Sequence, residues 1–408
     1  MLLKSYTRCL VLLSLTAMLA SSVHSQQTAA LIGTAKFFRP DDPQRPDLPQ
    51  LGVQYSTVLV ASDGATASVK ATLPDIIVPH EKDWWRVGVK FDCQTMERPD
   101  TTQESPDTEA GDWVEQLYVS RIGEVPQVLP GFSPSTDACP AQLVADFKRG
   151  KDRRAPKDAA DLVGAAPFQP CVYRTVTITA VTPNFVSTTD HGGNSGECET
   201  RGFSWTDGAS TQRMEDSMPV PYSDVLGQQG WEEYNRVLVE SGKALADSGF
   251  NCDLSEEALK QKEPQMAHDI GWYLGRAEGR WMAVASYQPG NASCQYAGAL
   301  SLRLPKEVVG YDTLRPEWAS LERQLRGLRD AFTSPAGDLL VAIRESQVEI
   351  YALRGQKVGD KLVALPADRV VMVQWAAGKY VDGWVKEMQT WEKKTLPPPM
   401  IRKQEDTN

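Results

Sequence analysis

The sequence predicts an exported α+β protein built from several regions. Short runs of β-branched and aromatic residues, bounded by Gly, Pro and Asn, predict antiparallel sheets in the N-terminal and middle parts. Apolar residues at intervals of three and four predict helices in the second half of the chain. The cysteines beyond the first 25 residues lie between positions 93 and 294, so a disulfide-bearing middle is expected to precede a cysteine-free C-terminal module.

Residues 1–25 have the pattern of a cleavable signal peptide. Lys4 and Arg8 provide positive charge, and an apolar run follows over residues 9–20. That run is shorter than the ~20 residues of a membrane-spanning helix. Small side chains at Val23 and Ser25 suit a signal peptidase, so we expect cleavage near Ser25. The mature protein is then expected in the periplasm or the extracellular space, without a membrane span.

The next two regions are predicted to differ in structure. Four prolines between positions 40 and 49 predict an extended, Pro-rich arm over residues 26–50. Residues 51–140 are predicted to form an N-terminal β region. Its clearest strand has Trp85, Val87 and Val89 alternating with polar or small residues, the pattern of a half-buried strand.

Residues 141–310 are predicted to form a middle β/α domain. Val172–Thr179 is rich in β-branched residues and predicts a strand. With a second strand at Thr200–Trp205 it would make a long hairpin, whose loop spans Pro183–Glu197. Trp231–Leu245 has apolar residues at helical spacing.

Six cysteines remain after removal of the signal peptide, and an even number in an exported chain predicts disulfides. These are Cys93, Cys139, Cys171, Cys198, Cys252 and Cys294. Short loops favour pairing of sequence neighbours, Cys93–Cys139, Cys171–Cys198 and Cys252–Cys294, although other pairings stay open. Asn291 opens an Asn-Ala-Ser glycosylation sequon, which matters only in a host that glycosylates exported chains.

Residues 311–395 are predicted to form a C-terminal αβββα layer. A helix starting at Pro316 is expected to run through Phe332, followed by three strands. The closing helix has an apolar stripe that includes Trp384 and Trp391. Residues 396–408 contain prolines and then charged residues, which predicts a disordered tail.

One motif suggests catalysis. Asp190 and His191 precede Gly-Gly-Asn-Ser-Gly, and the turn around Ser195 resembles the nucleophile turn of trypsin-like serine proteases. His80 lies upstream, as that resemblance requires, but without the flanking residues of the family. Gly, Asn and Ser are also typical of a plain hairpin loop, which is the interpretation we favour.

Other ligand classes have no sequence signature. The histidines are far apart and no phosphate-loop motif follows a predicted strand, so we expect neither a metal nor a cofactor. The net charge of −10 argues against nucleic acid. The leading hypothesis is therefore a non-enzymatic protein that binds a protein or glycan partner. The alternative is a secreted hydrolase acting on glycan or peptide, with a site assembled from dispersed residues.

Overall fold

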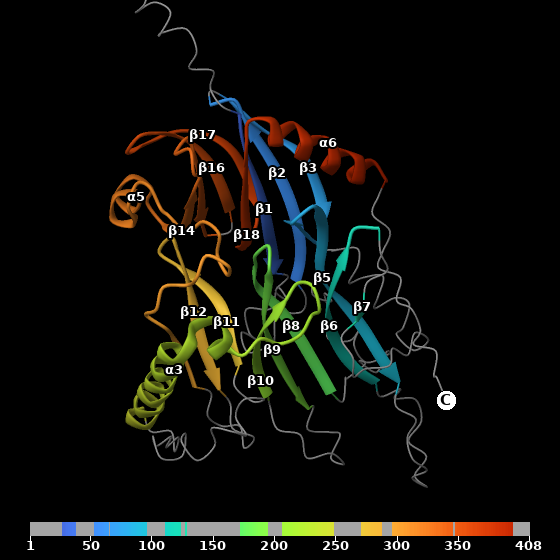
Figure 1. The fold of residues 1–408 in the computed structure, drawn as a ribbon, viewed down its shortest axis with the longest axis vertical. Coiled ribbons are helices and arrows are strands. Elements are labelled where there is room, and N and C mark those ends of the chain that lie inside the picture. The colour runs from blue at the N-terminus through green and yellow to red at the C-terminus, as the bar shows by residue number, and fades with distance from the viewer. Residues whose placement is uncertain are drawn as a thin grey trace, which may run out of the picture.

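A computed structural model describes residues 27–37, 53–64, 66–95, 111–123, 127–128, 172–194, 206–248, 271–287, 296–345 and 347–394. These residues form several antiparallel sheets and three helices, which agrees with the predicted α+β class at this coarse level. In Figure 1 the sheet of β1, β2, β3 and β18 lies in the upper half, with the sheet of β14–β17 to its left and the other two sheets lower in the view. None of the described helices is long and apolar enough to cross a membrane.

The central sheet joins the two ends of the described chain. Its strands, in the order β18-β1-β2-β3, are Arg369–Ala377, Thr28–Phe37, Val53–Ser62 and Ala67–Pro74. Strand β1 pairs antiparallel with β18 on one side and with β2 on the other. The prediction of an extended arm is therefore wrong for Thr28–Phe37, which forms an inner strand.

Composition explains why β1 was missed. The strand reads Thr-Ala-Ala-Leu-Ile-Gly-Thr-Ala-Lys-Phe, with few strong β-formers and no alternation. Ala30 and Ile32 belong to one hydrophobic cluster, whereas Ala29 and Leu31 belong to another, so the strand is buried on both faces. A strand buried on both faces loses the alternating pattern by which it would be recognised. The absence of a side chain at Gly33 also lets layers approach closely: a Cβ there would lie 3.1 Å from Cδ1 of Ile76, which belongs to another sheet.

A second sheet has the strand order β10-β9-β8-β6-β5-β4, with β7 paired to β6. In chain order its strands are Ile76–His80, Asp83–Thr95, Gly111–Arg121, Gln127–Val128, Val172–Val181, Phe185–Asn194 and Thr206–Arg213. It thus unites strands from both sides of the boundary that we expected after residue 140. The predicted strand at Val172–Thr179 is confirmed as β8.

The predicted loop at Pro183–Glu197 is wrong over most of its length. The turn is short, with the Thr182 N–H donating to Phe185 O at 2.8 Å, and Phe185–Asn194 forms β9. The physical reason is the run from Val186 to Thr189, whose β-branched and small polar side chains suit a strand. Residues 195–205, which include the expected second strand, lie outside the described residues.

The remaining two sheets share a hydrophobic cluster with the face of the central sheet that carries Ala30 and Ile32. One consists of β11 (Gly271–Ala277), β12 (Arg280–Tyr287) and β13 (Tyr296–Ala299), and α3 (Tyr222–Asp247) packs on it (Figure 1). The other follows α5 (Trp318–Gln324) and has four strands in chain order. They are β14 (Leu328–Thr333), β15 (Leu339–Arg344), β16 (Gln347–Arg354) and β17 (Lys357–Pro366).

The predicted αβββα layer is therefore wrong in two respects. The apolar stripe after Pro316 does not continue as one helix: α5 ends at Gln324, and Leu328 and Phe332 belong to strand β14. Gly327, with a φ of 76°, makes the bend between helix and strand at little steric cost. In addition, β18 and the last helix, α6 (Lys379–Lys394), belong to the central sheet instead of to this layer.

Helix α6 covers the free edge of the central sheet (Figure 1). The Gln389 side chain donates to Lys70 O at 3.1 Å, and the Thr72 N–H donates to the Glu392 carboxylate at 2.9 Å. These bonds satisfy backbone groups of β3 that would otherwise be left open at the sheet edge. Trp384, which is partly buried, contacts Trp84 edge-on with ring centroids 5.5 Å apart.

Several predictions fall outside the described residues. They concern the signal peptide at residues 1–25, the tail at 396–408, Asn291, and the side chains of all six cysteines. Of these cysteines, Cys93 has a described backbone, which lies in β5 opposite Trp113. The disulfides and the glycosylation site stay predictions.

Candidate functional site

A cluster of histidine and carboxylate side chains lies where three turns of the second sheet meet. His80 is the last residue of β4, and Glu81 occupies the turn to β5 with a φ of 52°. Glu215 follows the end of β10, and Pro183 lies in the turn between β8 and β9. The ligand-capable atoms of the three titratable side chains all lie within 4.8 Å of one another.

His80 is held firmly in this cluster. Its side chain is only 8% exposed, and its ring contacts Trp85 edge-on with centroids 5.6 Å apart. Nδ1 lies 2.5 Å from the carbonyl oxygen of Pro183, and Nε2 lies 3.5 Å from Oε1 of Glu215. Since a carbonyl oxygen can only accept, Nδ1 must carry a proton and donate it to Pro183. Nε2 is therefore the nitrogen that faces the carboxylates.

A second polar arrangement fills the gap where the second sheet splits. Strands β6 and β8 are parallel and pair at only two positions, Trp113↔Tyr173 and Val114↔Arg174. Beyond them, side chains satisfy the buried N–H groups of β8. The Val176 N–H donates to the Glu115 carboxylate at 2.8 Å, and the Ile178 N–H donates to the hydroxyl oxygen of Tyr55 at 2.8 Å.

Burial controls the ionisation of these two groups. Glu115 is 5% exposed, and removal from water raises its pKa from 4.5 to about 7, although the bond from Val176 acts in the opposite direction. Burial likewise raises the pKa of Tyr55 well above its usual value. Glu115 therefore takes up a proton on acidification below about pH 7, inside a closed layer of the fold.

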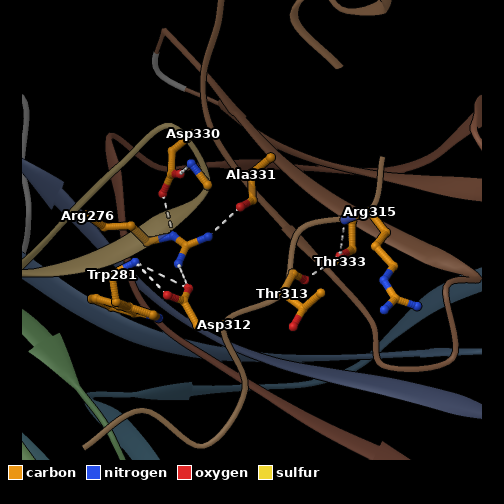
Figure 2. A network of polar contacts seen from close by, with 9 residues as sticks. Arg276, Trp281, Asp312, Thr313, Arg315, Asp330, Ala331 and Thr333 are labelled. Atoms are coloured by element: carbon orange, nitrogen blue, oxygen red, sulfur yellow. Dashed lines mark hydrogen bonds and ion pairs between the residues drawn. The ribbon is translucent and has the colours of Figure 1, made fainter. Parts of the chain in front are cut away.

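A third arrangement joins two sheets around one guanidinium group (Figure 2). Arg276 on β11 donates through Nε to Asp330 on β14 at 2.7 Å, and through Nη1 to Asp312 at 3.2 Å. Its remaining nitrogen donates to the carbonyl oxygen of Ala331. The guanidinium carbon also lies 3.5 Å from the centre of the Phe332 ring. This buried arginine, bonded through each of its three nitrogens, links the two sheets.

Glu349 links three neighbouring strands. Its carboxylate accepts from Tyr351 Oη at 2.7 Å, from Lys361 Nζ at 2.9 Å and from Arg344 Nη1 at 3.1 Å. Burial raises the pKa of Glu349, but these bonds outweigh that effect and bring it to about 2. The group therefore stays charged at neutral pH.

Asp190, the one residue of the predicted catalytic motif whose side chain is described, does not belong to the His80 cluster. Asp190 lies in the middle of β9, directly opposite Gly208 of β10, and its carboxylate occupies the space where a Gly208 side chain would be. His191 is next in the strand, and Ser195 lies outside the described residues. Pro183, which bonds to His80, lies before the start of β9, roughly 17 Å or more from Asp190 at ~3.3 Å per residue. Asp190 therefore lies away from the imidazole of His80, and the proposed role of Ser195 stays a prediction.

Sequence reasoning missed the cluster at His80. The ligands come from positions 80, 81 and 215, and no ligand spacing along the chain connects the third to the first two. The only local signal is His80-Glu81 between two strand-like runs, a dipeptide without specificity.

A short part of the chain is similar to a known enzyme. Over 115 residues it is 31% identical to "Alanine--tRNA ligase" of Gluconobacter oxydans (strain 621H). This alignment covers 28% of the present chain and 13% of the ligase, so it does not establish membership of that family. No family model matches the chain, and no solved structure gives a significant match.

Proposed function

We propose that this protein is an exported, non-enzymatic binding protein of the periplasm or the extracellular space, and that its partner is a protein or a glycan. Export is supported by the signal-peptide pattern and by the six remaining cysteines. The non-enzymatic role is supported by the buried charged side chains, which form their hydrogen bonds within the fold.

The observation that carries this proposal is that buried ionisable groups bond to the scaffold itself. Glu115 completes the hydrogen bonding of β8, Arg276 joins two sheets, and Glu349 links three strands. Glu115 has a pKa in the range of a general acid or base, but it is 5% exposed and lies between strands. A catalytic group must come within hydrogen-bond reach of the substrate. These groups serve stability instead.

The test compares binding with turnover. The mature protein is crosslinked in the exported fraction of its host, and the captured protein or glycan is then purified and titrated against it. We expect saturable binding, and no hydrolysis of peptide or glycan libraries above the buffer rate.

The opposite result would favour the hydrolase. Hydrolysis that is lost in Asp190→Asn, but retained in the control Asp382→Asn on the exposed side of α6, would overturn the binding proposal. Failure of saturable binding to every purified candidate would also count against it.

A further inference from the structure

The His80 cluster places two electron-pair acceptors face to face. Because Nδ1 donates its proton to Pro183 O, the neutral imidazole carries a lone pair on Nε2. That lone pair faces Oε1 of Glu215 at 3.5 Å, and an ionised carboxylate is also an acceptor. Two acceptors in this arrangement repel each other unless a donor or a cation lies between them, and a metal ion satisfies both at once.

We propose that His80, Glu81 and Glu215 bind a divalent transition-metal ion, and that Zn²⁺ is a suitable probe for it. Imidazole nitrogen and carboxylate oxygen are both zinc ligands, and three protein ligands leave a position open for water. The hydrogen bond from Nδ1 to a backbone carbonyl is the outer-shell contact that orients ligating histidines. The imidazole disfavours Mg²⁺ and Ca²⁺, which prefer oxygen ligands.

The cluster combines one fixed ligand with two adjustable ones. His80 is nine-tenths buried, whereas Glu81 is exposed and the Glu215 side chain is 67% exposed. Present separations of up to 4.8 Å exceed those between ligands that share an ion at ~2.0–2.2 Å from each. The exposed glutamates can rotate towards Nε2 and close this gap without movement of the buried imidazole.

Neighbouring charges partly balance the two carboxylates. Lys82 lies next to Glu81 in the turn, and Arg121 approaches Asp83 at 3.5 Å while its guanidinium lies over the Trp85 ring. Asp216 adds a further carboxylate beside Glu215. The net charge around the cluster stays favourable for a divalent cation.

The experiment is a calorimetric titration of the full mature protein with ZnCl₂, together with thermal unfolding with and without Zn²⁺. The test variant is Glu81→Gln/Glu215→Gln, which changes exposed side chains and leaves the buried His80 intact. The matched control, Asp382→Asn/Glu387→Gln, removes the same two charges from exposed positions on α6.

We expect one zinc ion to bind per wild-type and control chain and to raise the unfolding temperature of both. The test variant should bind about tenfold or more weakly, the effect typical of disturbed metal shells, and should lose the rise in unfolding temperature. Equal zinc affinity in all three proteins would place the ion elsewhere and overturn the proposal. Absence of zinc binding to the wild type would also overturn it.

Discussion

Replacement of Glu115 with Gln should make the protein more stable at alkaline pH. The folded protein holds a proton on Glu115 up to about pH 7, whereas the unfolded chain releases it near 4.5. Between these values the native state binds more protons than the unfolded state, so the free energy of unfolding falls as the pH rises. Gln is uncharged at all pH values and keeps an oxygen that can accept the Val176 N–H.

The magnitude follows from the two pKa values. A shift from 4.5 to about 7 corresponds to a cost of about 3 kcal/mol at pH 8, at ~1.4 kcal/mol per pKa unit. At pH 5 the same calculation leaves a cost of only about 1 kcal/mol, because only the part of the interval between the two pKa values that lies below pH 5 then contributes. Glu115→Gln should therefore gain about 2 kcal/mol relative to the wild type between pH 5 and pH 8.

Urea unfolding of both proteins at pH 5 and pH 8 measures this double difference. Every other titrating group is common to both proteins, so its contribution cancels. Glu387→Gln, an exposed change on α6, serves as the control and should show no pH-dependent difference. A loss of stability of Glu115→Gln relative to the wild type between pH 5 and pH 8 would refute this reasoning. It would mean that the folded protein does not hold Glu115 in its protonated form up to about pH 7.

Three further substitutions test the packing. Arg276→Met should lower the free energy of unfolding by about 3–5 kcal/mol, because Asp330 is left buried without its partner, whereas the exposed Arg236→Met should have a far smaller effect. Gly33→Ala should cost about 1–3 kcal/mol by overpacking β1, and Gly310→Ala, with open space around it, should not. Trp384→Ala should cost about 2 kcal/mol, less than the ~3–5 kcal/mol of a fully buried aromatic residue, because its indole is only partly covered. Urea unfolding curves check all of these, and equal effects in test and control variants would contradict the assigned contacts.

The elements with strong local signals could be predicted from the sequence. Val172–Thr179 is densely β-branched and forms most of β8, and the alternation around Trp85 and Val87 corresponds to β5. The helix expected at Trp231–Leu245 lies within α3. In β8 and α3 the periodicity of apolar residues matches the burial of a single face, which is the condition under which such patterns are informative, whereas in β5 Arg86 is buried on the opposite face as well.

Elements whose burial depends on distant partners could not be predicted. β1 is identified as a strand only by its pairing with β2 and with β18, and β18 lies more than 300 residues further along the chain. The stripe from Trp318 to Phe332 keeps helical spacing, yet tertiary contacts divide it between α5 and β14. Here Leu321 and Leu328 enter the same hydrophobic cluster from a helix and from a strand. Periodicity alone cannot tell one continuous helix from a helix followed by a strand.

The pairing of β1 with β18 also bears on the His80 cluster. One face of β1 packs in the same hydrophobic cluster as Ile76, Val78 and Trp85, which belong to the hairpin that carries His80 and Glu81. Burial of Trp85 beneath the imidazole fixes the ring, and Pro183 then determines which nitrogen faces outwards. Because the first and last strands of the described chain both contribute to the hydrophobic cluster that contains Trp85, loss of either should loosen the packing around His80. A fragment limited to residues 51–140 should not reproduce the His80 cluster, because it lacks both of these strands as well as Pro183 and Glu215.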